Sequence, residues 1–221
     1  MARITSYHPL ARYPRGPWAN VTSPPPPYLD SSCRREPDFE HPFPAITGLC
    51  RKGKTASFLV GERVAYFTVG RAHHLTAIFK IEASFSSHEE ANTRWYQPHS
   101  LRPPRNVIVH GSEPVPYEVT CGFYKGENKV IVRPGEGRDP VQLVQEWDGL
   151  YRKRMSEAQH VHVCRVLFVE VEHPPVLTKD GAARVFPGRR FPGTQNPKKE
   201  NERVIDALAA ELCITLRVAA A

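Results

Sequence analysis

Alternating apolar and polar residues predict a series of β-strands along the 221-residue chain. The alternation is clearest at 63–69 and 74–85, which are rich in β-branched and aromatic residues and are separated by a short basic turn. We therefore expect these two segments to pair as an antiparallel hairpin. The segment 160–172 carries apolar residues on both faces of a period-2 pattern, which is typical of a strand inside a sheet. Further extended segments are expected at 2–7, at 106–110, and in a hairpin formed by 118–124 and 128–134.

Helical spacing predicts three helices at the periphery of these strands. The segment 86–96 opens with Ser87 and has Glu90 three residues later, which is the signature of a capping box. The segments Pro140–Met155 and Glu202–Arg217 space their apolar residues along one helical stripe. Strands outnumber helices and are mostly joined by turns. The pattern therefore predicts an α+β fold with a curled, mainly antiparallel β-barrel or sheet and peripheral helices.

Proline divides the chain into two parts. The sequence has 22 prolines, about twice the usual share, and many of them lie in the first 45 residues. Each proline removes a backbone donor and fixes φ, so this stretch cannot hold regular helix. We expect 1–45 to be a proline-rich extended segment that packs on or flanks the core, and 46–221 to form a single domain.

The net charge and the cysteine content limit the classes of function that are expected for this protein. The chain has 30 basic and 23 acidic residues, and the net charge of +7 suits a phosphate-bearing partner. It has no apolar run long enough for a transmembrane helix or a signal peptide, so we expect an intracellular, cytoplasmic protein without a membrane partner. The five cysteines are scattered and form no CxxC pair, which favours free thiols. No cofactor is expected.

Three basic loops carry the candidate ligand contacts. The run Arg51-Lys52-Gly53-Lys54 precedes the strand at 63–69, and both a solvated turn and a ligand-binding strand end fit it. The loops at 102–106 and 188–200 also combine arginine with amide side chains, which suit phosphate oxygens and base edges respectively, although each alone also fits a structural connector. The nucleic-acid-binding candidates are Arg51, Lys52, Lys54, Arg105, Asn106, Arg189, Arg190, Gln195 and Asn196, and the base-stacking candidates are Trp18, Tyr66 and Trp95. For Tyr66, a place in the core fits better.

Two histidines are the weak metal candidates. His160 and His162 lie two residues apart on a predicted strand, so both would project to one side and could share a metal ion. A third ligand is not evident, and a strand with alternating polar residues explains the same pattern. The sequence contains no GxSxG and no recognisable Cys–His signature, so no catalytic residue is assigned.

The phrase FLVGERVAYFTVG, followed by the next strand and a short acidic helix, resembles the core hairpin of PUA-like domains. The similarity covers residues 42–96 and is to the EVE type and related nucleotide-modification-associated domains. Gly61-Glu62-Arg63-Val64 stands where Gly-Asp-x-Val is usual in that family. The resemblance implies a small curled barrel whose cleft accepts a base or nucleotide, often a modified one. It does not imply catalysis.

These observations lead to three functional hypotheses. The first is a nucleic-acid or nucleotide binding module that recognises a modified base in a modification, restriction or defence context. The second is a metal- or histidine-dependent enzyme that acts on nucleotides or nucleic acid. The third is a protein-interaction domain that docks through its proline-rich N-terminus.

Overall fold

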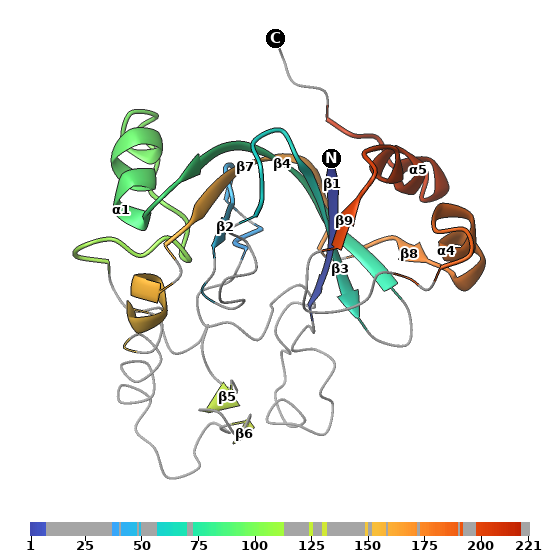
Figure 1. The fold of residues 1–221 in the computed structure, drawn as a ribbon, viewed down its shortest axis with the longest axis horizontal. Helices are drawn as coiled ribbons and strands as arrows, with labels where there is room; N and C mark the ends of the chain where they lie inside the picture. Colours follow the sequence, from blue (N-terminus) through green and yellow to red (C-terminus); the bar gives the residue numbers. More distant parts are fainter. Residues whose placement is uncertain are drawn as a thin grey trace.

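A curled β-sheet dominates the computed structural model of this chain (Figure 1). The structure describes residues 1–7, 37–39, 41–47, 49, 57–69, 73–112, 124–125, 130–131, 149, 152–157, 159–171, 173–189, 191 and 198–217. The main strands are β1 (Ala2–Tyr7), β2 (Ala45–Thr47), β3 (Arg63–Val69), β4 (His73–Phe85), β7 (Val161–Val169), β8 (Val176–Leu177) and β9 (Lys198–Glu200). Their order is β2-β7-β4-β3-β1-β9, and β8 pairs with the start of β4. All pairs are antiparallel except β1 with β3, which is parallel. The expected α+β fold with a curled, mainly antiparallel sheet is confirmed.

Register shifts curl the sheet into a half-barrel. They fall between Tyr66 and Phe67 in the β3–β4 pair, and at two points in the β4–β7 pair. One of these β4–β7 shifts skips Leu167, and the other skips Glu82. An extra residue on one strand bends it and increases its twist. It also moves the following side chains to the opposite face, so the strict alternation expected along 160–172 is wrong beyond Leu167.

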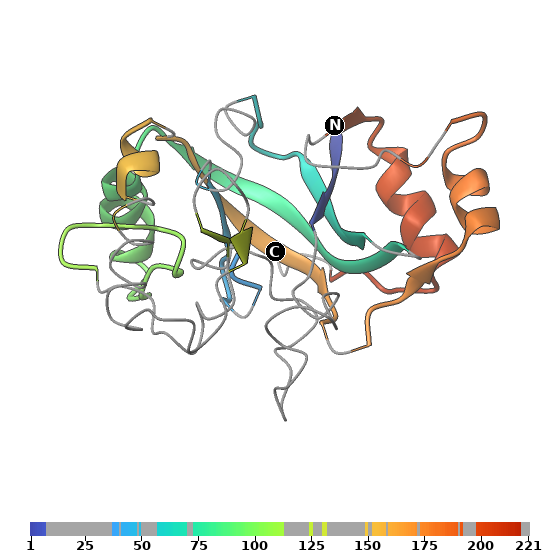
Figure 2. The same ribbon diagram turned by 90° about the horizontal axis from the view of Figure 1, so that it is seen from below.

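Helices cover the two ends of β4 (Figure 2). At one end, α1 (His88–Ala91) and the π-helix η2 (Asn92–Tyr96) pack on a cluster that includes Val161 and Val163. At the other end lie α4 (Lys179–Val185) and α5 (Arg203–Glu211), which pack on a cluster that contains Ala2 and Ile4 of β1 and Ala65 and Phe67 of β3. We call the face that carries both sets of helices the outer face. The opposite face is filled by a third cluster, which is built around Phe39, Phe58, Tyr66 and Phe79.

The expected strands at 2–7, 63–69, 74–85 and within 160–172 are confirmed. The strand β7 lies inside the sheet between β2 and β4, as its two apolar faces predict. The expected hairpin of 118–134 is confirmed where the structure describes it, because β5 (Tyr124–Lys125) pairs antiparallel with β6 (Val130–Ile131).

The helix expected over 86–96 is also confirmed, with its cap. Ser87 Oγ accepts a hydrogen bond from the Glu90 backbone N–H at 3.0 Å. The Glu90 carboxylate accepts from the backbone N–H and the hydroxyl of Ser86, at 2.9 and 2.6 Å. The return half of the box therefore reaches one residue further back than in the usual pattern.

Several sequence expectations are wrong in extent or kind. The segment 106–110 forms turns and irregular backbone instead of an extended piece. The last helix is shorter than expected and spans Arg203–Glu211. The expected loop at 188–200 contains β9, and the helix α4 was not predicted. Most of the helix expected at Pro140–Met155 lies outside the described residues. The part that is described, Gly149 and 152–155, is helical, and this helical segment continues to residue 157.

Candidate nucleic-acid interface

Three basic side chains form a row across the middle of the outer face. Arg63 on β3 lies opposite Lys80 on β4, and Lys80 lies opposite Arg165 on β7. Like charges directly opposite each other destabilise a sheet, so such a row needs compensation. Glu82, the residue skipped by the β4–β7 register, supplies part of it: its carboxylate lies 3.1 Å from Arg165 Nε and 3.8 Å from Lys80 Nζ. The Lys80 side chain remains 43% exposed.

Arg63 is held by the first turn of α5. Its Nη1 and Nη2 donate to the two carboxylate oxygens of Asp206 at 2.6 and 3.1 Å, and Nη2 also donates to the Glu202 carbonyl at 2.9 Å. The hydrogen bond with Asp206 raises the pKa of Arg63 above its ordinary value. The same bond lowers the pKa of Asp206 below its ordinary value. Arg63 therefore fixes the start of α5 over the start of β3.

A groove of about 600 Å³ opens between the start of α5 and the row of basic side chains. This volume lies in the range of small-molecule and cofactor sites. The groove is lined by Gly61, Arg63, Lys80, Asn201, Glu202, Arg203 and Asp206. We call it the α5–β3 groove. The Arg203 side chain is exposed, and no ion pair of its guanidinium group is found within the described part of the chain.

The turn at 57–62 forms one lip of this groove. A buried ion pair holds the turn: Arg3 Nε lies 3.0 Å from the Glu62 carboxylate, and Arg3 Nη2 donates to the Ser57 carbonyl at 2.7 Å. Phe58 is buried beneath the turn, with the Arg3 guanidinium 4.9 Å from the centre of its ring. Gly61 closes the turn at φ 87°, a conformation that L-residues rarely adopt.

The four cations in and beside the α5–β3 groove were not among the candidates predicted from the sequence. They are Arg63, Lys80, Arg165 and Arg203. The available signal was a single Lys or Arg within a mostly apolar strand: Lys80 in 75–81 and Arg165 in 161–169. A charged residue at such a position either pairs or faces a ligand, because an unpaired charge is expensive to bury.

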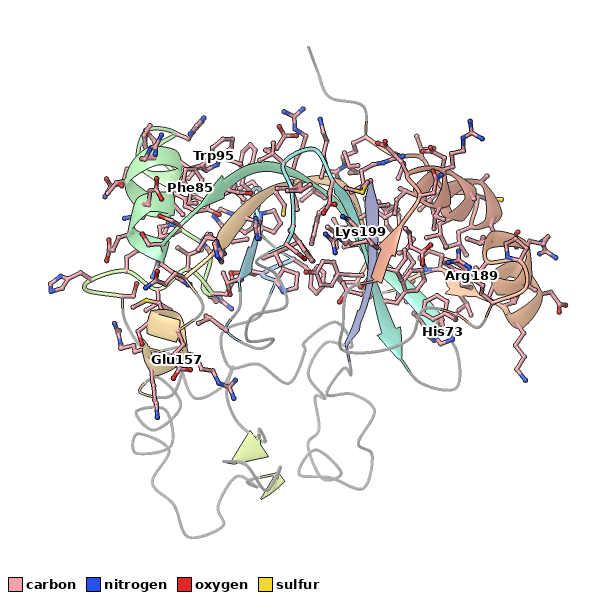
Figure 3. The ribbon with its side chains drawn as sticks, viewed as in Figure 1. His73, Phe85, Trp95, Glu157, Arg189 and Lys199 are labelled. Carbon is pink, nitrogen blue, oxygen red and sulfur yellow. The ribbon has the colours of Figure 1, made fainter. Side chains whose placement is uncertain are left out.

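The structure places the described candidates apart. Trp95 and Arg189 lie at opposite ends of the sheet (Figure 3). The Arg189 guanidinium is 3.0 Å from the Glu200 carboxylate. Trp95 packs against Phe43 and stacks on His99, with ring centroids 5.9 and 4.8 Å apart. These two candidates therefore do not form one binding surface.

Three further candidates hold the fold together. Tyr66 is 3% exposed and packs edge-on against Phe39, in the core where its sequence context placed it. Asn106 is fully buried, and its side-chain amide donates to the Ala45 carbonyl at 2.7 Å. The backbone of Arg105, whose side chain is exposed, donates to the Asp38 carboxylate at 3.4 Å. The candidates Trp18, Arg51, Lys52, Lys54, Arg190, Gln195 and Asn196 lie outside the described residues.

The two histidines of the metal hypothesis differ in environment. His160 is exposed, whereas His162 is 2% exposed and stacks on Phe58. His162 Nδ1 lies 2.8 Å from the hydroxyl of Ser84 on the neighbouring strand. Within the described ranges, no group of three or more His, Cys, Asp or Glu side chains could hold a metal ion.

No protein-family model, curated protein or solved structure matches this chain. The resemblance of residues 42–96 to PUA-like domains therefore stays a prediction. In the part of the chain that the structure describes, no helix is long and apolar enough to cross a membrane.

Proposed function

We propose that this protein binds nucleic acid or nucleotides, with phosphate groups held at the α5–β3 groove. The observation that carries the proposal is the row of Arg63, Lys80 and Arg165 in cross-strand register beside this groove. Like charges in such a row repel one another, Asp206 and Glu82 offset part of this repulsion, and an anion that lies along the row would offset more of it. Arg203, at the start of α5, adds a fourth cation and the positive end of the helix dipole.

The groove also offers groups that suit a base. Asn201 and Glu202 line it beside the cations. Amide and carboxylate side chains pair with the donor and acceptor groups on base edges, whereas arginine and lysine hold phosphates. A ligand with an anionic end and a hydrogen-bonding heterocycle matches this combination. Recognition of a modified base by a PUA-like domain is the specific form of the proposal that the resemblance of residues 42–96 supports.

Fluorescence anisotropy with labelled single- and double-stranded DNA and RNA tests the proposal. We expect Lys80→Ala to weaken binding and to flatten the plot of log affinity against log salt by about 0.7 to 0.9 for each lost phosphate contact. The matched control is Lys153→Ala, which removes the same charge from the exposed face of the helical segment 152–157. If Lys80→Ala and Lys153→Ala weaken binding equally, the oligonucleotide is held by the overall positive charge of the protein and not by a specific site. Failure of every oligonucleotide and of free nucleotides to bind would reject the proposal.

A second substitution tests the groove from the acidic side. Asp206→Asn removes the carboxylate that holds Arg63 through two hydrogen bonds. We expect tighter oligonucleotide binding and a steeper salt dependence, because one more cation then becomes available to phosphate. Weaker binding at an unchanged unfolding midpoint would show that phosphates do not reach Arg63.

One observation favours the alternative of a histidine-dependent enzyme. Ser84 is exposed, and its hydroxyl lies 2.8 Å from Nδ1 of the buried His162, which is within reach of a nucleophile and its base. A fluorophosphonate tests the pair: the Ser84 oxygen would bond to phosphorus, fluoride would leave, and the hydroxyl proton would pass to His162. Labelling of Ser84 that is lost in His162→Gln would support this function. A peptide map without labelled Ser84 would reject it.

A further inference from the structure

Two aliphatic side chains stand in solvent at the tip of the turn that precedes β3. Leu59 is 52% exposed and Val60 is 60% exposed. Within the described ranges, the other large hydrophobic residues of comparable exposure are Met1 and Val176, at 48% and 44%. Scattered single exposures of this kind need no explanation. Two adjacent exposed aliphatic side chains beside the α5–β3 groove do need an explanation.

The exposure of this tip is imposed by a rigid turn. The Leu59 backbone N–H donates to the Glu62 carboxylate at 3.2 Å, and the Glu62 N–H donates to the Leu59 carbonyl at 3.1 Å. The Gly61 N–H donates to the Ile81 carbonyl at 2.8 Å, which ties the turn to β4. Phe58 fills the space below the tip with 4% exposure. The tip therefore cannot fold its two aliphatic side chains back onto the core without breaking these contacts.

The apolar tip lies beside the groove cations at the start of β3. Gly61, which follows Val60 directly, lines the α5–β3 groove together with Arg63 and Lys80. Figures 1 and 2 both show the segment that enters β3 beside the N-terminus, next to the start of β1. In the sequence, the basic residues Arg51, Lys52 and Lys54 come shortly before the turn. Basic residues thus occur near this short aliphatic projection both in the groove, where Glu202 and Asp206 accompany them, and earlier along the chain.

We propose that Leu59 and Val60 insert as a wedge between adjacent bases of the bound strand, while the groove cations hold the flanking phosphates. This inference rests on the proposed nucleic-acid function. Proteins that unstack a base step use apolar side chains such as leucine for the purpose, and they recover the cost through contacts to the backbone on either side. The tip has the required chemistry, a fixed geometry and neighbouring cations.

A nucleic-acid strand fits the tip and the groove better than a lipid surface does. Gly61 of the turn lines the groove, and the carboxylates of Glu202 and Asp206 line it together with the cations. A bilayer presents its headgroups as a broad plane, which would meet the tip but would not enter the groove. A strand can place a phosphate in the groove and an adjacent base step at the tip.

2-Aminopurine fluorescence tests the wedge, because this base is quenched when it is stacked and brightens when it is unstacked. Duplex and single-stranded oligonucleotides with 2-aminopurine at an internal step are titrated with the full-length protein. We expect the wild-type chain to raise the fluorescence at saturation. The double variant Leu59→Ser/Val60→Ser should lose this increase while keeping the salt dependence of binding. The matched control, Val176→Ser, removes an exposed aliphatic side chain from β8 and should behave as the wild type.

The outcomes separate the wedge from the proposed function. If the wild type binds oligonucleotides without brightening 2-aminopurine, or if the double variant brightens it equally, the wedge is rejected and nucleic-acid binding stands. If no oligonucleotide binds, the wedge is rejected, and if free nucleotides also fail to bind, the proposed function falls with it. Vesicles of phosphatidylserine and phosphatidylcholine form the last arm. Vesicle binding that is lost in the double variant, without oligonucleotide binding, would assign the tip to a membrane surface and overturn the wedge.

Discussion

The buried ion pair between Arg3 and Glu62 makes the turn before β3 sensitive to a single substitution. The two side chains are 6% and 2% exposed, and their closest atoms lie 3.0 Å apart. Glu62→Gln keeps the size of the side chain and one hydrogen-bond acceptor but removes the negative charge. The Arg3 guanidinium would then be buried without a counter-charge, which destabilises a folded protein by about 3–5 kcal/mol. Because the glutamine side chain of Glu62→Gln still accepts one hydrogen bond, we expect a loss of stability of about 3 kcal/mol.

Urea unfolding followed by circular dichroism measures this loss. For a chain of this length, about 3 kcal/mol corresponds to a fall of roughly 6 to 12 °C in Tm. The double variant Arg3→Met/Glu62→Leu is the control, because it removes both charges and leaves no isolated one in the interior. Replacing a buried pair with apolar residues of similar volume is often neutral or stabilising. We therefore expect the double variant to be more stable than Glu62→Gln.

Two results would refute this reasoning. A loss of less than about 1 kcal/mol in Glu62→Gln would mean that water reaches the pair, since exposed pairs contribute about that much. A double variant as unstable as Glu62→Gln would mean that the loss comes from the hydrogen bonds to Ser57 and Leu59 and not from the isolated charge.

Three further predictions concern other parts of the structure. Gly61→Ala should lower the free energy of unfolding by about 1–2 kcal/mol in urea titrations, because alanine is strained at φ 87°. In native protein, peptide mapping after maleimide treatment should find Cys213 modified and Cys164 protected, because Cys213 is exposed while complete burial raises the pKa of the Cys164 thiol. Hydrogen bonds from Ser86 lower the pKa of Glu90 to about 2, so its contribution to the helix cap should be present above about pH 4.5 and be lost as the pH falls through about 2. An NMR titration of the Glu90 carboxyl that gives an ordinary pKa would contradict the last of these.

Local features of the fold could be predicted because their causes lie within a few residues. Ser87 and Glu90 identify the start of a helix through contacts that span four residues. The hairpin of β3 and β4 follows from two alternating segments joined by a short turn. The helix α4 was missed because Gly181 interrupts a short sequence with few apolar residues, although Thr178 caps it. The strand β9 is a polar segment whose pairing partner is distant in the sequence, so nothing local marks it as a strand.

The candidate site could not be predicted because it depends on register. Lys80 and Arg165 are 85 positions apart in the sequence, and they face each other only in the register that follows the skip at Leu167. A slip of one residue would send Arg165 to the opposite face of the sheet. Nucleic-acid contacts were predicted instead in loops rich in arginine. Among the described residues of these loops, the guanidinium of Arg189 is held by the Glu200 carboxylate.

The position of β1 governs when this sheet can be completed during synthesis. The first strand pairs with β3 on one side and with β9 on the other, so its two partners lie about 60 and about 200 residues along the chain. Contacts between such distant segments form slowly, because the intervening chain must first be closed into a loop. The amino-terminal strand therefore leaves the ribosome long before either neighbour exists. Until Lys198–Glu200 has emerged, the β9-facing side of β1 is an unpaired edge, and that edge is where a translating chain is most open to chaperones or to another nascent copy.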